Sequence, residues 1–124
     1  MIVEAKRMQQ GVGIIYLSGA LNTDSLGAFK EEIAALADEG FESIVVDCRE
    51  LGSISSSGLA SLIWAKRKAH AKGSKVYFTH VSATIAEVLA ITKLSSLLSI
   101  EATTRGFLER RGFLRKKRLS PVRN

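Results

Sequence analysis

Three consecutive serines, Ser55, Ser56 and Ser57, are the residues of this sequence whose type and spacing best suit chemistry. They lie in the stretch 51–62, between an apolar segment that indicates a strand and an apolar run that indicates a helix. Such a position suits a hydroxyl that is exposed, rigidly held and open to modification. We predict that Ser57 is a phosphorylation switch on a small protein-binding module. The alternative is a capped helix after a loop, with no modification.

The serines lack the neighbours that an enzymatic nucleophile needs, a base and a group that orients the base. The sequence has no Gly-x-Ser-x-Gly elbow and no serine three residues before a lysine. Its two histidines, His70 and His80, have no cysteine or carboxylate at ligand spacing along the chain. Gly11 and Gly13 begin a dinucleotide fingerprint, but Tyr16 stands where the third glycine belongs. We expect no enzyme, no catalytic residue, no metal and no cofactor.

Size and composition favour one folded domain that works in a reducing compartment. The chain has 124 residues, 46% of them hydrophobic, with one proline and ten glycines. Its single cysteine, Cys48, excludes an intrachain disulfide and suits a small buried filler at the end of an apolar strand. No run approaches the roughly 18 apolar residues of a membrane span, and the N-terminus lacks a signal peptide pattern. We predict a cytoplasmic location.

The net charge of +6 comes from one end of the chain. Residues 110–124 hold seven of the eighteen basic residues and no acidic residue, whereas residues 1–109 carry eleven basic and twelve acidic side chains. We therefore divide the chain into a nearly neutral domain, 1–109, and a basic C-terminal tail, 110–124. Such a tail is typically a solvated end, or it contacts an anionic surface. Because it lacks interleaved aromatic residues, we expect no direct binding of nucleic acid.

Hydrophobic periodicity predicts strands alternating with helices. Strands are predicted at 2–8, 14–17 (ended by Gly19), 44–48, 76–78 and 97–100. Helices are predicted after the capping types Asn22, Thr23 and Asp24, from about Ser57 to Ala71, after Ser82, and from Thr103. Leu59, Leu62 and Ile63 are expected to form the inner face of the second helix. This order predicts an α/β fold with a mostly parallel central sheet of four to five strands and about four helices.

Four segments follow one another along the chain: Leu17-Ser18-Gly19-Ala20-Leu21-Asn22, Ile44-Val45-Val46-Asp47, Ser55-Ser56-Ser57-Gly58-Leu59 and a basic helix ending at Lys72-Gly73-Ser74. In this order they resemble the STAS domains of bacterial anti-sigma-factor antagonists, over roughly residues 1–110. The first segment is similar to the family pattern after its second strand, the second to its third strand, and the third to its motif Asp-Ser-Ser-Gly-Leu. Two positions depart from the family: Ser55 and Asn22 stand where it usually has aspartate.

The resemblance implies a regulator that binds an anti-sigma factor, itself a serine protein kinase, and is released on phosphorylation of the serine before the glycine, here Ser57. Losing two carboxylates at the contact face should change electrostatic steering and partner choice more than the fold. The rival interpretation is a STAS adaptor or scaffold, not phosphorylated, within a larger signalling or lipid-transport assembly. The sequence leaves the oligomeric state open. The residues expected to contact a partner are Asn22, Thr23, Ser55, Ser56, Ser57, Gly58, Leu59 and Trp64.

Asn22 and Trp64 each have a second interpretation. Asn22 is also a common residue in turns and at helix caps. Trp64 falls off the stripe formed by Leu59 and Ile63, so it is either a partly exposed anchor for a partner or a packed part of the core.

Overall fold

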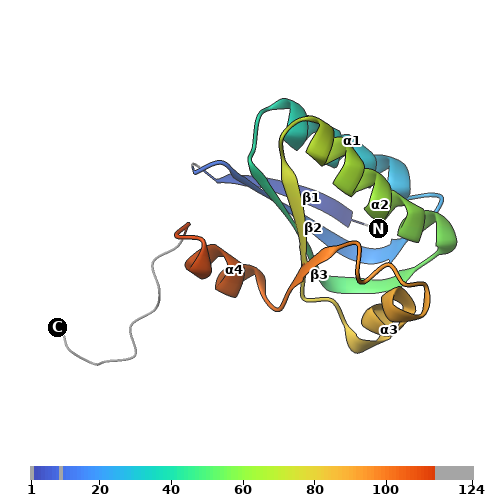
Figure 1. Cartoon of the computed structure of the whole chain (residues 1–124). Coiled ribbons are helices and arrows are strands. Elements are labelled where there is room, and N and C mark those ends of the chain that lie inside the picture. The colour runs from blue at the N-terminus through green and yellow to red at the C-terminus, as the bar shows by residue number, and fades with distance from the viewer. Residues whose placement is uncertain (1, 9, 114–124) are drawn as a thin grey trace, which may run out of the picture.

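The computed structural model describes residues 2–8 and 10–113, and these residues form one sheet with helices on both of its faces (Figure 1). The strands are β1 (Ile2–Met8), β2 (Val12–Leu21), β3 (Ser43–Ile54), β4 (Lys75–Thr79) and β5 (Ser99–Glu101). The helices are α1 (Leu26–Asp38), α2 (Ser56–Ala71), α3 (Ala83–Ile91) and α4 (Thr104–Arg110). The predicted order of elements and the predicted fold class are confirmed.

The five strands lie in sequence order, β1-β2-β3-β4-β5. β1 and β2 form an antiparallel pair through a short turn, and the three later pairs are parallel because a helix connects their strands. The carboxyl ends of β2, β3 and β4 therefore meet at one end of the sheet, where connecting loops place functional side chains in α/β proteins.

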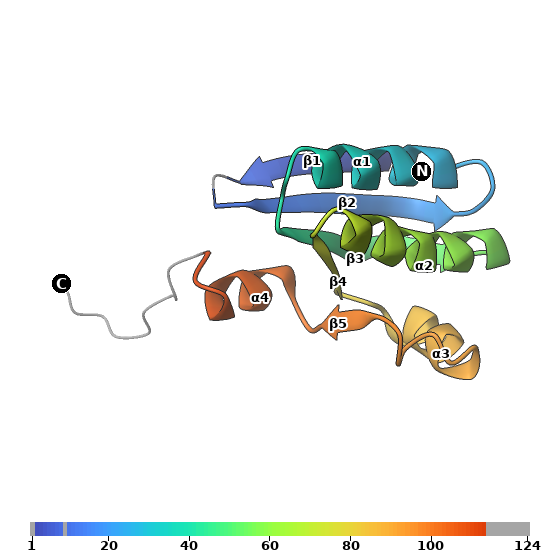
Figure 2. The same ribbon diagram turned by 45° about the horizontal axis from the view of Figure 1, so that its top comes forward.

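The two faces of the sheet are covered unequally. α1 and α2 lie side by side along one face (Figure 2), and with α3 they bury the larger core. That core contains Phe29 and Leu36 of α1, Leu62 of α2, and Ile15 and Val46 of the sheet. On the opposite face the short helix α4 buries Phe107 and Leu108 on a smaller cluster, which contains Val12, Ile14, Val45 and Tyr77. The larger core contains most of the buried apolar side chains and therefore supplies most of the hydrophobic stabilisation.

Two predicted strand ends were wrong, and both lie beside the serine motif. β2 continues past Gly19 to Leu21 because Gly19 adopts φ +100 and two register shifts against β3 absorb the irregularity. β3 continues past Cys48 to Ile54, so the predicted loop before the helix shrinks to Ser55. Glycine and serine rarely favour strands, and here the pairing with β2 overrides that preference.

Two details of the helices also differ from the prediction. Helix α1 begins at Leu26, and none of Asn22, Thr23 and Asp24 is its N-cap residue, because Ser25 occupies that position. In α2 only Leu62 of the three predicted inner residues is buried, while Leu59 and Ile63 are half-buried. Small residues form the rest of the buried face of α2, which brings this helix close to the sheet; they are Gly58, Ser61, Ala65 and Ala69.

Candidate functional site at the start of α2

The serine motif lies at one end of the sheet, where β2 and β3 have their carboxyl ends. These two strands are neighbours, and their register ends on the pair Leu21 and Ile54. The amide of Ser55 donates a hydrogen bond to the carbonyl oxygen of Leu21 at 3.0 Å, and α2 begins at the next residue. The first turn of α2 is therefore fixed directly against the end of β2.

Gly58 explains why the motif needs a glycine after its serines. The residue is buried, and a Cβ at this position would collide with the carbonyl oxygen of Leu21 and lie 2.8 Å from Cγ1 of Ile54. Any side chain would push the start of α2 away from β2. Gly58 thus fixes where Ser57 stands, and it does so through its missing Cβ rather than through backbone flexibility.

The hydroxyls of Thr23, Ser55 and Ser57 form a cluster at the start of α2. Ser55 Oγ accepts a hydrogen bond from the amide of Gly58 at 3.1 Å, so Ser55 is the N-cap residue of α2. Ser57 Oγ lies 2.9 Å from Ser55 Oγ and 3.1 Å from Thr23 Oγ1. Because Ser55 caps the helix, the hydroxyl of Ser57 is left to these contacts with neutral groups. Helix α2 begins at Ser56, one residue before the predicted start at Ser57.

The loop between β2 and α1 brings Thr23 to this cluster. Asn22 Oδ1 accepts a hydrogen bond from the amide of Asp24 at 2.9 Å, which closes an Asx turn. The amide of Asn22 donates to Ser25 Oγ, and that hydroxyl donates to the carbonyl oxygen of Ala20. Asn22 and Ser25 thus hold the loop, as the turn interpretation of Asn22 expects.

The residues of the predicted partner surface are not equally accessible. Asn22, Thr23, Ser55, Ser56 and Ser57 all lie at the start of α2 or in the loop beside it, and Thr23 and Ser56 are exposed. Ser57 and Leu59 are half-buried, and Gly58 is buried. Trp64 lies two turns further along α2, half-buried against the larger core, with Lys30 Nζ of α1 5.1 Å from the centre of its ring. Its indole packs against the larger core beside Lys30 of α1, apart from the hydroxyl cluster.

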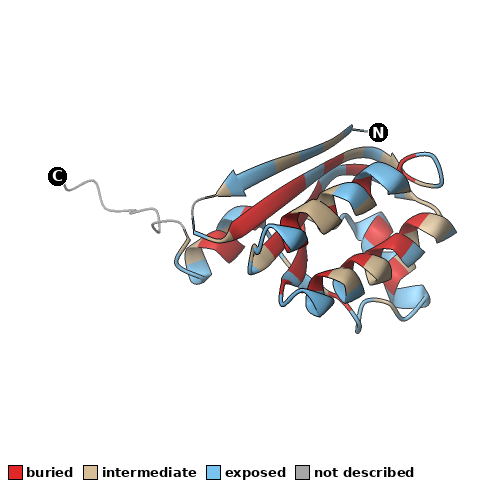
Figure 3. Cartoon of the chain, turned by 90° about the horizontal axis from the view of Figure 1, so that it is seen from above, coloured by how far each residue is buried: buried red, intermediate tan, exposed pale blue. Residues whose placement is uncertain are grey.

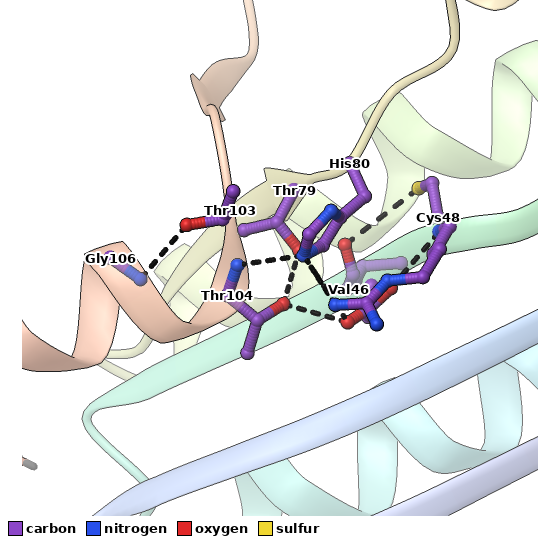
Figure 4. A network of polar contacts seen from close by, with 9 residues as sticks. Val46, Cys48, Thr79, His80, Thr103, Thr104 and Gly106 are labelled. Atoms are coloured by element: carbon purple, nitrogen blue, oxygen red, sulfur yellow. Dashed lines mark hydrogen bonds and ion pairs between the residues drawn. The ribbon is translucent and has the colours of Figure 1, made fainter.

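A second polar cluster, which the sequence analysis missed, lies under α4 (Figure 4). Asp47 of β3 is 4% exposed, and its carboxylate accepts hydrogen bonds from the amide of Arg49 at 3.0 Å and from the hydroxyl of Thr104 at 2.8 Å. Since Thr104 donates its one hydroxyl proton to the carboxylate, Thr79 is the donor in the 2.6 Å contact between the two threonines. This chain of bonds fixes the start of α4 to β3 and β4.

His80 completes the second cluster through one ring nitrogen. The backbone amide of Thr104 donates to His80 Nε2 at 3.1 Å, and a guanidinium nitrogen of Arg49 lies 2.8 Å from the same atom. Both groups are donors, so Nε2 is the unprotonated nitrogen of a neutral ring. The 4.0 Å approach of Nε2 to Asp47 is therefore not an ion pair. The only sequence signal for this cluster was the aspartate at the end of the predicted third strand.

The free thiol of Cys48 is not a candidate nucleophile. It is buried in the larger core, and this burial, together with the charge of Asp47, raises the pKa of the Cys48 thiol to about 12. A thiol with such a pKa stays protonated at neutral pH. Within the described part of the chain, no three His, Cys, Asp or Glu side chains are grouped to hold a metal ion. Nor is any helix of that part long and apolar enough to cross a membrane.

A family profile matches most of the chain. The profile of the family described as "Mlab, STAS domain" matches residues 4–99, which include the hydroxyl cluster and all strands except the first two residues of β1 and the last two of β5. The chain therefore belongs to the STAS domain family. Comparison with curated protein sequences gives no match.

Solved structures show the same fold at low sequence identity. The anti-sigma factor antagonist SpoIIAA in its unphosphorylated form is 16% identical, with a TM-score of 0.70 over 90% of this chain and 98% of that one. SpoIIAA of Bacillus in the phosphorylated form is 18% identical, with a TM-score of 0.69 over 89% and 99% of the two chains. An anti-sigma factor antagonist from Mycobacterium paratuberculosis is 17% identical, with a TM-score of 0.76 over 88% and 92%. A sulfate transporter family protein from Wolinella succinogenes is 15% identical, with a TM-score of 0.75 over 87% and 90%.

Proposed function

We propose that this protein is an anti-sigma-factor antagonist of a partner-switching pathway. It is a cytoplasmic regulator without enzymatic activity, which binds an anti-sigma factor that is also a serine protein kinase and dissociates from it when Ser57 is phosphorylated. The observation that carries this proposal is the position of the Ser57 hydroxyl. It stands in the first turn of α2, half-exposed, and its two hydrogen-bond partners are neutral hydroxyls.

A phosphate on Ser57 is compatible with the fold. The first amides of a helix have no acceptor within the helix, and the dipole favours negative charge at this end. A phosphate adds a charge of about −1.5 to −2 and three acceptor oxygens, which suits these amides. Ser55 contributes to the same end: where the family usually has aspartate, this chain places an uncharged hydroxyl 2.9 Å from Ser57 Oγ. The added charge therefore meets no repulsion from residue 55.

The phosphate would therefore change the binding of the partner rather than the stability of the fold. We propose that the partner-binding surface consists of Asn22 and Thr23 from the loop, with the start of α2 from Ser55 to Leu59. Charge and bulk would arrive at the centre of a surface that fits a small neutral group. A loss of about 3 kcal/mol of binding free energy weakens binding more than a hundredfold, enough for a switch. Trp64, which is half-buried beside Lys30 of α1, would contribute to binding through the part of its side chain that stays accessible.

Two substitutions at one position test the proposal. Ser57→Asp should weaken binding of the kinase by roughly a hundredfold, while the free energy of unfolding changes by less than about 0.5 kcal/mol. Ser57→Ala should bind as tightly as the wild type, and incubation with the kinase and ATP should not release it. Isothermal titration with the kinase measures the first effect, and mass-spectrometric mapping of the modified residue measures the second.

A matched control separates the site from the added charge. Ser95→Asp places the same carboxylate on an exposed serine between α3 and β5, and it should leave binding unchanged. Equal binding by wild type and Ser57→Asp, or phosphate mapped to another residue, would overturn the proposal.

A second function, that of an adaptor in a larger assembly, is favoured by the similarity to the sulfate transporter family protein. An adaptor would bind its partner through the same end of α2 in a permanent complex. Mapping after incubation with kinase and ATP distinguishes the two functions, since the switch gains phosphate at Ser57 and the adaptor gains none. The basic tail can be tested separately. Its residues 114–124 lie outside the described residues, and deleting them, which keeps α4 and the packed Phe113, would abolish an activity that depends on the charge of the tail.

A further inference from the structure

The two edges of the sheet differ in length and in chemistry. β5 forms one edge with three residues, whereas β1 forms the other with seven, and β1 pairs with β2 alone in the described part of the chain. Figure 3 shows β1 as the outer strand, coloured mostly as exposed or intermediate. A long edge strand presents unpaired backbone donors and acceptors to any strand that fits them. Ile2 of β1 is also a large apolar residue that is 58% exposed.

The sequence of β1 is complementary to itself when it is read backwards. Ile2, Glu4, Lys6 and Met8 alternate with the other residues and therefore share one face of the sheet. Two antiparallel copies related by a two-fold axis through Ala5 place Glu4 of each copy opposite Lys6 of the other, and Ile2 opposite Met8. Opposite charges and apolar residues directly across a strand pair stabilise it. Neither Glu4 nor Lys6 has an ion-pair partner among the described residues.

We propose that two copies of this chain associate edge to edge through β1, antiparallel and with the two-fold axis at Ala5. The two five-stranded sheets then continue into one sheet, and the interface is isologous, as in most homodimers. This interface goes beyond the proposed switch and does not depend on it.

Neighbouring registers are disfavoured by charge. Moving the axis to Glu4 sets this carboxylate opposite its own copy, and moving it to Lys6 sets two ammonium groups opposite each other. Like charges directly opposite destabilise a strand pair. Only the register through Ala5 also pairs all seven residues of β1. Arg7 does not interfere, because it lies on the other face and two of its guanidinium nitrogens donate to Glu39 of α1 at 2.6 and 2.7 Å.

Charge reversal tests both the interface and its register. Glu4→Lys and Lys6→Glu each turn both cross-strand ion pairs into repulsions, so each variant alone should dimerise at least about tenfold more weakly than the wild type. An equimolar mixture of the two variants should dimerise again, because each lysine then faces a glutamate of the other chain. The double variant Glu4→Lys/Lys6→Glu should regain the wild-type affinity. Sedimentation equilibrium of the full chain at several concentrations measures all four.

Two controls test whether a change in dimerisation is specific to β1. Glu87→Lys makes the same change on the exposed surface of α3 and should leave the dimer unchanged. Far-UV circular dichroism and thermal unfolding should show that each variant folds. Three results would overturn the proposal: a wild type that sediments as a monomer up to about 1 mM, single variants that dimerise like the wild type, or a mixture that dimerises no better than its components.

Discussion

The hydroxyl cluster at the start of α2 and the Asp47 cluster under α4 differ in charge and burial. The first contains three hydroxyls and no charge, and its Ser57 and Ser55 are half-buried. The second contains a carboxylate that is 4% exposed and accepts hydrogen bonds from Arg49 and Thr104. A buried carboxylate needs such donors, because an unsatisfied charge away from water is very costly.

This difference separates a structural cluster from one that is open to modification. In the Asp47 cluster, the hydrogen bonds of Thr104 to Asp47 and Thr79 connect α4 to β3 and β4. The hydroxyl cluster adds few bonds to the fold, and the start of α2 is also fixed by the backbone hydrogen bond of Ser55 and the close approach of Gly58, both to Leu21. We therefore expect a change at Ser57 to leave the fold intact and a change at Asp47 or Thr104 to disturb it. The free energies of unfolding of variants in the two clusters measure this contrast.

The largest loss is expected at the anchor of α2. In Gly58→Ala the new methyl collides with the carbonyl of Leu21 and lies 2.8 Å from Ile54, so the start of α2 must shift. We expect a loss of about 3 kcal/mol in the free energy of unfolding, from overpacking that exceeds the helix propensity gained from alanine. Denaturation by urea, followed by circular dichroism, measures it.

Gly27→Ala is the matched control for this loss. Gly27 lies in the first turn of α1, where a Cβ would meet no atom within 4 Å. Alanine there should stabilise the protein by roughly 0.5–1 kcal/mol. A Gly58→Ala protein as stable as the wild type would show that α2 is not fixed by this contact.

The next largest loss is expected under α4. Thr104→Val keeps the volume of the side chain but removes the hydroxyl that donates to Asp47 and accepts from Thr79. A hydrogen bond to a charged group contributes about 1.5–3 kcal/mol, so we expect a loss of about 2 kcal/mol. Thr84→Val, on the exposed surface of α3, should change stability by less than about 0.5 kcal/mol. Equal stability of the two variants would remove the distinction between the clusters.

The fold was predictable from the sequence because the spacing of apolar residues and the capping residues determine each helix from neighbouring positions in the chain. Leu26, Phe29, Ile33 and Leu36 recur at spacings of three, four and three, as the apolar stripe of a helix does, and the last three of these side chains are buried in α1. Ser82 and Thr103 were predicted at the starts of the last two helices, and each accepts a hydrogen bond from an amide of its helix. The predicted ends of the strands were wrong because they depend on partners distant in sequence. Pairing with β2 extends β3 through Gly52 and Ser53, although these residue types prefer loops.

The candidate site was predictable in its residues but not in their roles. The motif indicated a hydroxyl at a helix start, yet it did not distinguish Ser55 as the cap from Ser57 as the free hydroxyl. That distinction depends on the one-residue connection after β3 and on the contact of Ser57 with Thr23, which lies 34 residues away in the sequence. The Asp47 cluster was missed because it joins residues of β3, β4 and α4, whose approach no local pattern encodes.

A smaller loss is expected from the cap of α2. Ser55→Ala removes the oxygen that accepts from the amide of Gly58, and loss of such a cap typically costs about 1 kcal/mol. Ser82→Ala removes the corresponding cap of α3 and should cost a similar amount. Thermal unfolding compares the two stabilities. If the partner surface is placed correctly, only Ser55→Ala also changes the affinity for the kinase, and equal affinities for both variants would exclude Ser55 from that surface.

The smallest change in stability is expected at the proposed switch itself. Ser57→Ala removes two contacts between half-exposed hydroxyls, and water can replace both, so the free energy of unfolding should change by less than about 0.5 kcal/mol. Urea denaturation of Ser57→Ala beside Thr104→Val measures the contrast between the clusters in one experiment. A loss at Ser57 as large as that at Thr104 would mean that the hydroxyl supports the fold. A phosphate could then not be added there without cost to the domain, and the fold would no longer be independent of the switch.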